Sequence, residues 1–193
     1  MILTVLTATF VQHFCNHQKI KPMKQFTMIC LIWLTSHTLL AQVSQEFQLA
    51  EWERAKVYTK EYLDAMPDAG YSFKPTPEMR SFAEQMDHLA DANFAMAAAA
   101  SGKKSPMTGS AEKMPDQSKA AVTKVVLDSY DFVIAAIKAT PVTDYGKDIK
   151  LFGMETKSGI AFDKAFEHQT HHRGQTTVYI RLKGVKPPQE KLF

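Results

Sequence analysis

The chain has 193 residues, of which 45% are hydrophobic and 22% charged, enough to bury the core of one globular domain. The formal net charge is only +3 at pH 7, and basic residues gather only in a short run around Lys183 and Lys186. We therefore expect no nucleic-acid partner, because binding nucleic acid requires a basic surface that neutralises phosphates.

Residues 1–41 differ in composition from the rest of the chain. They hold no Asp or Glu, three Lys, and two apolar runs, ILTVLTATFV and FTMICLIWL. From Met23 a lysine, an apolar stretch and a polar segment ending at Ala41 follow one another, which is the pattern of an export signal. The apolar stretch is shorter than the roughly 20 residues of a membrane span. We predict an extension and cleaved signal peptide over 1–41, a domain over 42–193, and a periplasmic or secreted protein.

Removal of this leader would change both charge and cysteine content. It would leave 20 Lys and Arg against 20 Asp and Glu, a neutral chain. Cys15 and Cys30, the two cysteines, both lie in the leader. The mature chain would have neither a disulfide nor a thiol nucleophile.

The first two helices are expected over residues 45–66 and 76–101. Apolar residues recur at helical spacing in both segments. Pro67 ends the first helix, and Thr76 followed by Pro77 predicts the N-cap and first position of the second. Gly102 ends that helix after an alanine-rich stretch.

Two further helices are expected over residues 117–140 and 159–183. Pro141 closes the third, and Gly184 ends the fourth. The segment between them contains glycines at 146, 153 and 159 and is interpreted as a loop. Because no strand pattern competes, the fold class is all-α, a four-helix bundle.

The connection between the second and third helices bears on topology. It is polar, about 14 residues long, and contains two prolines. Fourteen extended residues reach about 46 Å, whereas a helix of 25 residues spans about 37 Å. The two helices can therefore run parallel, although the same connection could close a simple hairpin.

Four histidines follow the leader, and three of them form a candidate metal site. His168 and His172 are four residues apart, so their imidazoles lie one turn apart on one helix face. His171 is three residues from His168 and could serve instead. His88 falls near the middle of the second helix and meets the pair at mid-height whichever way the helices run. The alternative is a hydrogen-bonded histidine pair without a metal.

The segments FKPTPEMRSFAEQMDHLADAN and HQTHHRGQTTVYIRLKGVKPP resemble the DinB family (DinB/YfiT-like proteins) over nearly the whole mature chain. The resemblance implies an up-down-down-up four-helix bundle, often a homodimer. It implies a divalent metal, zinc or nickel, held by His88, His168 and His172, and it leaves His171 out. Some family members are thiol-dependent transferases or isomerases.

Three neutral imidazoles would leave coordination positions open for water or substrate, as in catalytic rather than structural zinc sites. Two functions follow: a metal-dependent hydrolase or thiol-dependent transferase acting on an unidentified small molecule, or a non-catalytic helical bundle that binds a metal or small molecule. A bundle without metal is the third possibility. Candidate general bases are Glu84, Asp87, Asp91 and Glu167, each of which could equally belong to a solvated acidic face. Asp91 could instead orient His88.

Four other residues have structural interpretations. Gly174, inside the fourth helix, is attributed to the close approach of a neighbouring helix. Arg173 and Gln175 are expected to form helix–helix hydrogen bonds. The first helix near Trp52 could present an apolar patch to a second copy of the chain.

Overall fold

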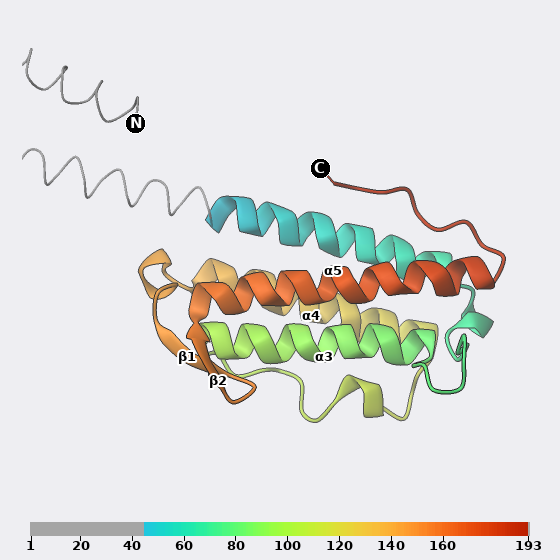
Figure 1. The fold of residues 1–193 in the computed structure, drawn as a ribbon, viewed down its shortest axis with the longest axis horizontal. Helices are drawn as coiled ribbons and strands as arrows, with labels where there is room; N and C mark the ends of the chain where they lie inside the picture. Colours follow the sequence, from blue (N-terminus) through green and yellow to red (C-terminus); the bar gives the residue numbers. More distant parts are fainter. Residues whose placement is uncertain (1–44, 193) are drawn as a thin grey trace, which may run out of the picture. The chain divides into compact units, whose positions relative to one another are not determined.

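Four helices form the part of the chain that the computed structural model describes, residues 45–192. They are the helix over residues 45–65, α3 (Phe82–Ser101), α4 (Lys119–Ala139) and α5 (Ser158–Leu182) (Figure 1). The export signal and its cleavage site lie outside the described residues. Among the described helices, none combines the length and apolarity needed to cross a bilayer.

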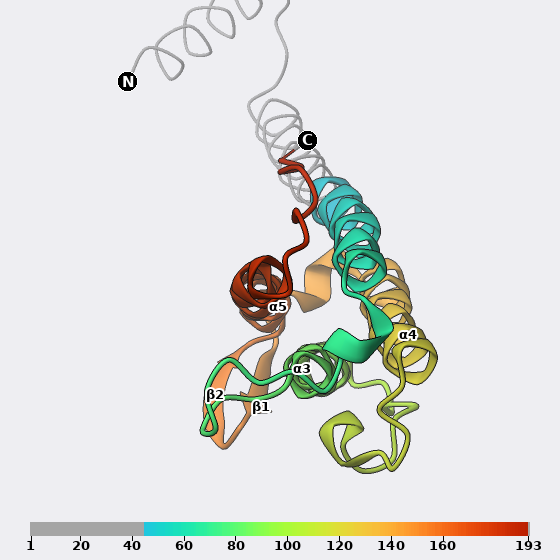
Figure 2. The same cartoon turned by 90° about the vertical axis from the view of Figure 1, so that its right-hand side faces the viewer.

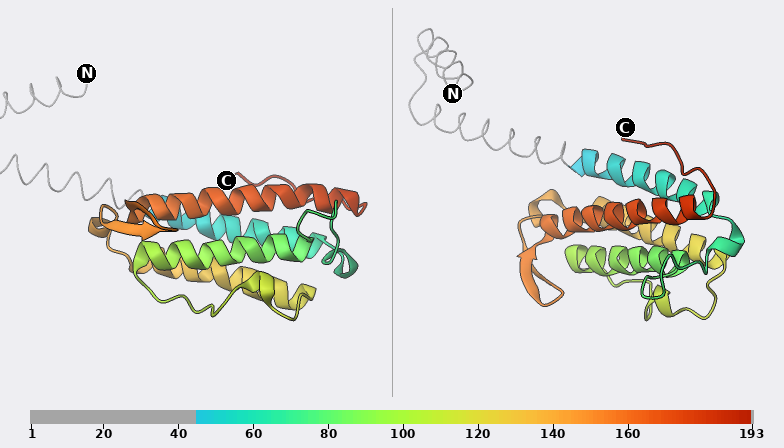
Figure 3. Two further views of the ribbon diagram at one scale, coloured as in Figure 1. Left: turned by 60° about the horizontal axis from the view of Figure 1, so that its bottom comes forward. Right: turned by 45° about the vertical axis from the view of Figure 1, so that its right-hand side comes forward.

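The helices run up, down, down and up. The 45–65 helix and α5 point one way in Figure 1, whereas α3 and α4 point the other way. The connection from α3 to α4 therefore returns along the whole bundle, on the outside of these two helices (Figure 3). The helices α3 and α4 are thus parallel, which is the arrangement that the length of this connection allows. The four helices enclose one core (Figure 2).

The helix α3 begins later than predicted. Its N-cap is Ser81 rather than Thr76, and Ser81 and Glu84 form a reciprocal capping box, which satisfies two backbone N–H groups at the helix start. The preceding segment folds back on the helix, because Phe82 N donates to Phe73 O and Ala83 N donates to Tyr71 O. Thr76 and Pro77 belong to a turn.

The segment before α5, interpreted as a loop, contains a β-hairpin. Strands β1 (Asp148–Leu151) and β2 (Met154–Lys157) pair in antiparallel register, joined by Phe152 and Gly153, both with positive φ. Two positive-φ residues are what a tight hairpin turn requires. The base of the hairpin is fixed where Ser158 Oγ donates to Ala100 O at 2.7 Å.

Side chains of all four helices fill the core. Trp52 is fully buried and makes edge-to-face contacts with Tyr130 and Phe166, so it cannot belong to an exposed patch. Phe47, in the first turn of the same helix, is 68% exposed although its spacing from Trp52 predicts a buried position. A Cβ at Gly174 would meet nothing within 4 Å, so the helix-approach explanation of this glycine is wrong.

Candidate metal centre

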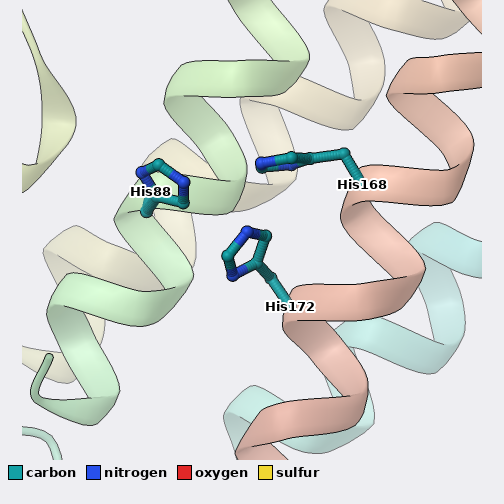
Figure 4. Close-up of side chains that lie close together, drawn as sticks. All are labelled: His88, His168 and His172. Carbon is teal, nitrogen blue, oxygen red and sulfur yellow. The ribbon is translucent and has the colours of Figure 1, made fainter. Parts of the chain in front are cut away.

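The helices α3 and α5 bring three histidine side chains together at mid-height of the bundle. Their ligand nitrogens all lie within 4.8 Å of one another. Figure 4 shows His88 reaching across from α3 toward His168 and His172, which project from successive turns of α5. His171 is exposed and lies outside this group, with its ring perpendicular to that of His172.

The two α5 histidines are held in the neutral form. Burial, followed by the repulsion of neighbouring positive groups, lowers the pKa of His168 to about 4. The same causes lower the pKa of His172 to about 3. A neutral imidazole has a free lone pair, so both rings can bind a cation at neutral pH without losing a proton.

A carboxylate outside the cluster orients His88. Glu112 Oε1 lies 2.6 Å from His88 Nδ1, so Nδ1–H donates to the carboxylate and Nε2 is left to bind an ion. Arg80 Nε donates to the other oxygen, Glu112 Oε2, at 2.9 Å. Burial raises the pKa of Glu112, but the hydrogen bonds from Arg80 and His88 outweigh it and hold the pKa below its usual value.

Asp91 does not contact His88 directly but holds the segment that carries Glu112. Its carboxylate accepts hydrogen bonds from Ser110 Oγ at 2.5 Å and from the backbone N–H groups of Ala111 and Glu112. These bonds fix the short helical turn Ala111–Lys113 against α3. Asp91 therefore places Glu112, and Glu112 orients His88. Glu112 could not be identified from the sequence, because it lies in the long connection and only its acidic side chain marks it there.

Gln85 contacts His172 from α3. Its Nε2 lies 2.8 Å from His172 Nδ1, and its amide also contacts that of Gln175. Gln175 in turn lies 2.8 Å from His171 Nε2. The expected helix–helix hydrogen bond of Gln175 is thus present. Arg173 instead bonds Gln169 within α5 and lies over the ring of Tyr58 on the 45–65 helix.

The donor set fits a divalent metal ion. His168 Nδ1 is buried and has no hydrogen-bond partner, which is unfavourable unless another group satisfies it. Nitrogens bound tetrahedrally at about 2.1 Å would lie roughly 3.4 Å apart. The three nitrogens lie within 4.8 Å of one another, so side-chain shifts on the order of an ångström reach that spacing. Imidazole ligands suit zinc and nickel, and also copper and iron.

The other three candidate bases have structural partners or lie away from the cluster. The Glu84 carboxylate accepts a hydrogen bond from Ser81 N at the start of α3 and pairs with Lys74 at 3.0 Å. Glu167 is exposed and pairs with Lys164 at 2.6 Å. Asp87 is fully buried, and neither carboxylate oxygen has a hydrogen-bond partner. None of the three presents a free carboxylate to the histidines.

We expect Glu112→Gln to weaken metal binding about 10- to 100-fold, the usual effect of losing a carboxylate that orients a ligating histidine. The amide keeps the size of the side chain but lacks the charge that holds His88 Nδ1–H. Competition titration with a chromophoric zinc chelator measures the change. Glu155→Gln, at an exposed position of β2, is the matched control, and equal affinities for the two variants would contradict the assignment.

The fold and the site together define a class of protein. It is a four-helix bundle in which three histidines converge from two helices. The DinB superfamily model matches residues 51–176, and the chain belongs to this superfamily.

Two solved structures share the fold. A DinB-like protein from Bacillus cereus ATCC 10987 has a TM-score of 0.66 and 21% identity, over 76% of this chain and 97% of that chain. A DinB-like protein from Bacillus subtilis has a TM-score of 0.59 and 18% identity, over 76% and 95%. No curated protein matches the chain.

Proposed function

We propose that this protein is a metal-dependent enzyme, a hydrolase or a thiol-dependent transferase, that holds zinc or nickel through His88, His168 and His172. The observation that carries the proposal is the convergence of three imidazoles, two of them kept neutral by burial. A metal held by three protein ligands keeps a position open, where it acidifies bound water or ionises a bound thiol.

Different residues around the cluster position the rings of His88 and His172. Glu112 and Arg80 orient His88, and Gln85 fixes the ring of His172. Because His88 and His172 are each held by a side chain from another element, these two donors are preorganised and lose little freedom when the ion binds.

The alternative function is a bundle that binds a metal or small molecule without turnover. The occupied carboxylates favour it, since Glu84, Asp91, Glu112 and Glu167 all have hydrogen-bond or ion-pair partners. Proton transfer would then depend on the substrate itself or on release of one of these groups.

Removal of the metal is expected to lower the melting temperature. An ion bound by the folded chain alone stabilises it by about 2.7 kcal/mol at a hundredfold excess over Kd. The measurement is a thermal scan of protein stripped with chelator and then restored with zinc or nickel. An unchanged melting temperature in all three states would favour the metal-free bundle.

Export remains part of the proposal because of the acid-free composition of residues 1–41. Expressed with its own leader, the protein is expected to begin at or near Gln42. Mass spectrometry of the soluble product tests this, and a cytoplasmic protein that retains residues 1–41 would overturn it. We propose that a homodimer would form through exposed apolar residues of the first described helix, such as Phe47 and Val57.

A further inference from the structure

A cavity of about 310 Å³ opens directly beside the histidine cluster. Its lining combines His88 and His168 with the apolar side chains of Ala92, Ala95, Met96 and Phe152. Given the metal site proposed above, on which this step rests, we infer that the cavity binds the hydrocarbon or aromatic part of a small molecule whose polar head group ligates the metal.

The walls of this apolar cavity offer almost no polar partner. Asp91 is the one charged side chain that lines it, and the Asp91 carboxylate already accepts hydrogen bonds from the 110–112 segment. A polar or charged group placed here would lose water without gaining a partner, whereas an apolar group would gain by leaving water. The two histidines in the lining are the groups left to bind a polar head group.

Phe152 contributes the outer wall in a conformation that phenylalanine rarely adopts. Its φ is 50° at the tip of the hairpin, where Asn or Gly is favoured, and its ring is 66% exposed. A left-handed backbone conformation is strained at such a residue. The β1–β2 turn therefore holds an exposed aromatic ring beside the metal site at the expense of backbone strain, which is explained if the ring contacts the ligand.

The size of the cavity limits the apolar group. At about 30 Å³ for each water-sized unit, it holds roughly ten non-hydrogen atoms. A single aromatic ring or a chain of six to eight carbons fits this space, whereas a long lipid tail would extend into solvent.

The test uses two thiols, ethanethiol and 1-hexanethiol, with the full chain loaded with cobalt(II). Binding of either thiol is followed through the sulfur-to-cobalt charge-transfer absorption. Each buried methylene favours binding by up to about fourfold, so hexanethiol is expected to bind on the order of tenfold more tightly or better. His168→Ala protein gives the background absorption, including any from Cys15 and Cys30.

Two hairpin variants assign the effect to the cavity. Phe152→Asn suits the positive φ and keeps the turn, but removes the ring. It is expected to weaken hexanethiol binding severalfold and to leave ethanethiol binding unchanged. Met154→Thr, which alters an equally exposed apolar side chain outside the cavity lining, is expected to change neither.

Failure of the two proposals can be told apart. If wild-type protein gives no cobalt absorption above that of His168→Ala, the metal site itself is absent. If cobalt binds but the two thiols bind equally well, or if Phe152→Asn and Met154→Thr act alike, the metal site stands and the apolar cavity is not a ligand site.

Discussion

Single replacement of His88, His168 or His172 by alanine is expected to remove most of the bound metal. Each variant leaves two imidazoles, and losing a direct ligand weakens binding by more than the roughly 100-fold that follows loss of an outer contact. The rings from α3 and α5 lie within 4.2 to 5.2 Å of one another, centroid to centroid. No single ring is therefore dispensable.

The matched control is His171→Ala, which is expected to leave the metal content nearly unchanged. His171 lies about 100° around the helix from His172, is exposed, and contacts the Gln175 amide. The measurement is the metal-to-protein ratio of untagged protein, with circular dichroism to show that each variant folds. Loss of metal in His171→Ala but not in His172→Ala would reverse the assigned helix face, and retention in all four variants would place the metal elsewhere.

The helices could be predicted from sequence because their signals are local. Proline and glycine stops placed the ends of α4 and α5 within two residues of those observed. The predicted start of α3 is wrong because two possible N-caps, Thr76 and Ser81, lie close together in the sequence. The helix begins after Ser81 because of its capping box and because the N–H groups of Phe82 and Ala83 donate to the carbonyls of Phe73 and Tyr71, contacts that the local sequence does not reveal.

The hairpin could not be predicted because its strands are only four residues long and mostly exposed. Such strands show little apolar alternation, and the turn carries phenylalanine where asparagine is the usual signal. Its stability comes from backbone pairing and from the Ser158 contact with the end of α3.

The three histidines could be grouped from spacing and family resemblance, whereas their supports could not. Gln85 shares a helix face with His88 at i, i+3, a relation visible in sequence but not distinctive. Glu112 is 24 residues from His88, and its position depends on the bonds that Asp91 makes to the connection. Contacts of that kind follow from the packed structure, not from local pattern.

The buried carboxyl of Asp87 makes stability dependent on pH. Burial raises the pKa of Asp87 to about 7, opposed by an interaction with Gln117 and reinforced by the acidic neighbours Asp91, Glu112 and Glu84. Both Asp87 oxygens and Gln117 Oε1 are buried without a hydrogen-bond partner. A protonated Asp87 can donate to Gln117 Oε1. This one hydrogen bond would give a partner to one Asp87 oxygen and to Gln117 Oε1.

The direction of the effect follows from the two pKa values. The unfolded chain loses this proton near pH 4, whereas the folded chain keeps it up to about pH 7. Between these values the folded state binds more protons, so the free energy of unfolding falls as pH rises. A difference of about three units corresponds to roughly 4 kcal/mol of stability present below pH 4 and lost above pH 7.

Asp87→Asn is therefore expected to stabilise the metal-free protein by a few kcal/mol at pH 8 and to change stability little at pH 4. The Asn amide cannot ionise, and its N–H can donate to Gln117 Oε1 as the protonated acid does. Urea unfolding of metal-free wild type and variant at the two pH values measures the difference. Asp128→Asn, at an exposed position of α4 paired with Lys124, should show no such gain at pH 8. Equal stability changes for Asp87→Asn at pH 4 and pH 8 would mean that Asp87 ionises normally in the fold.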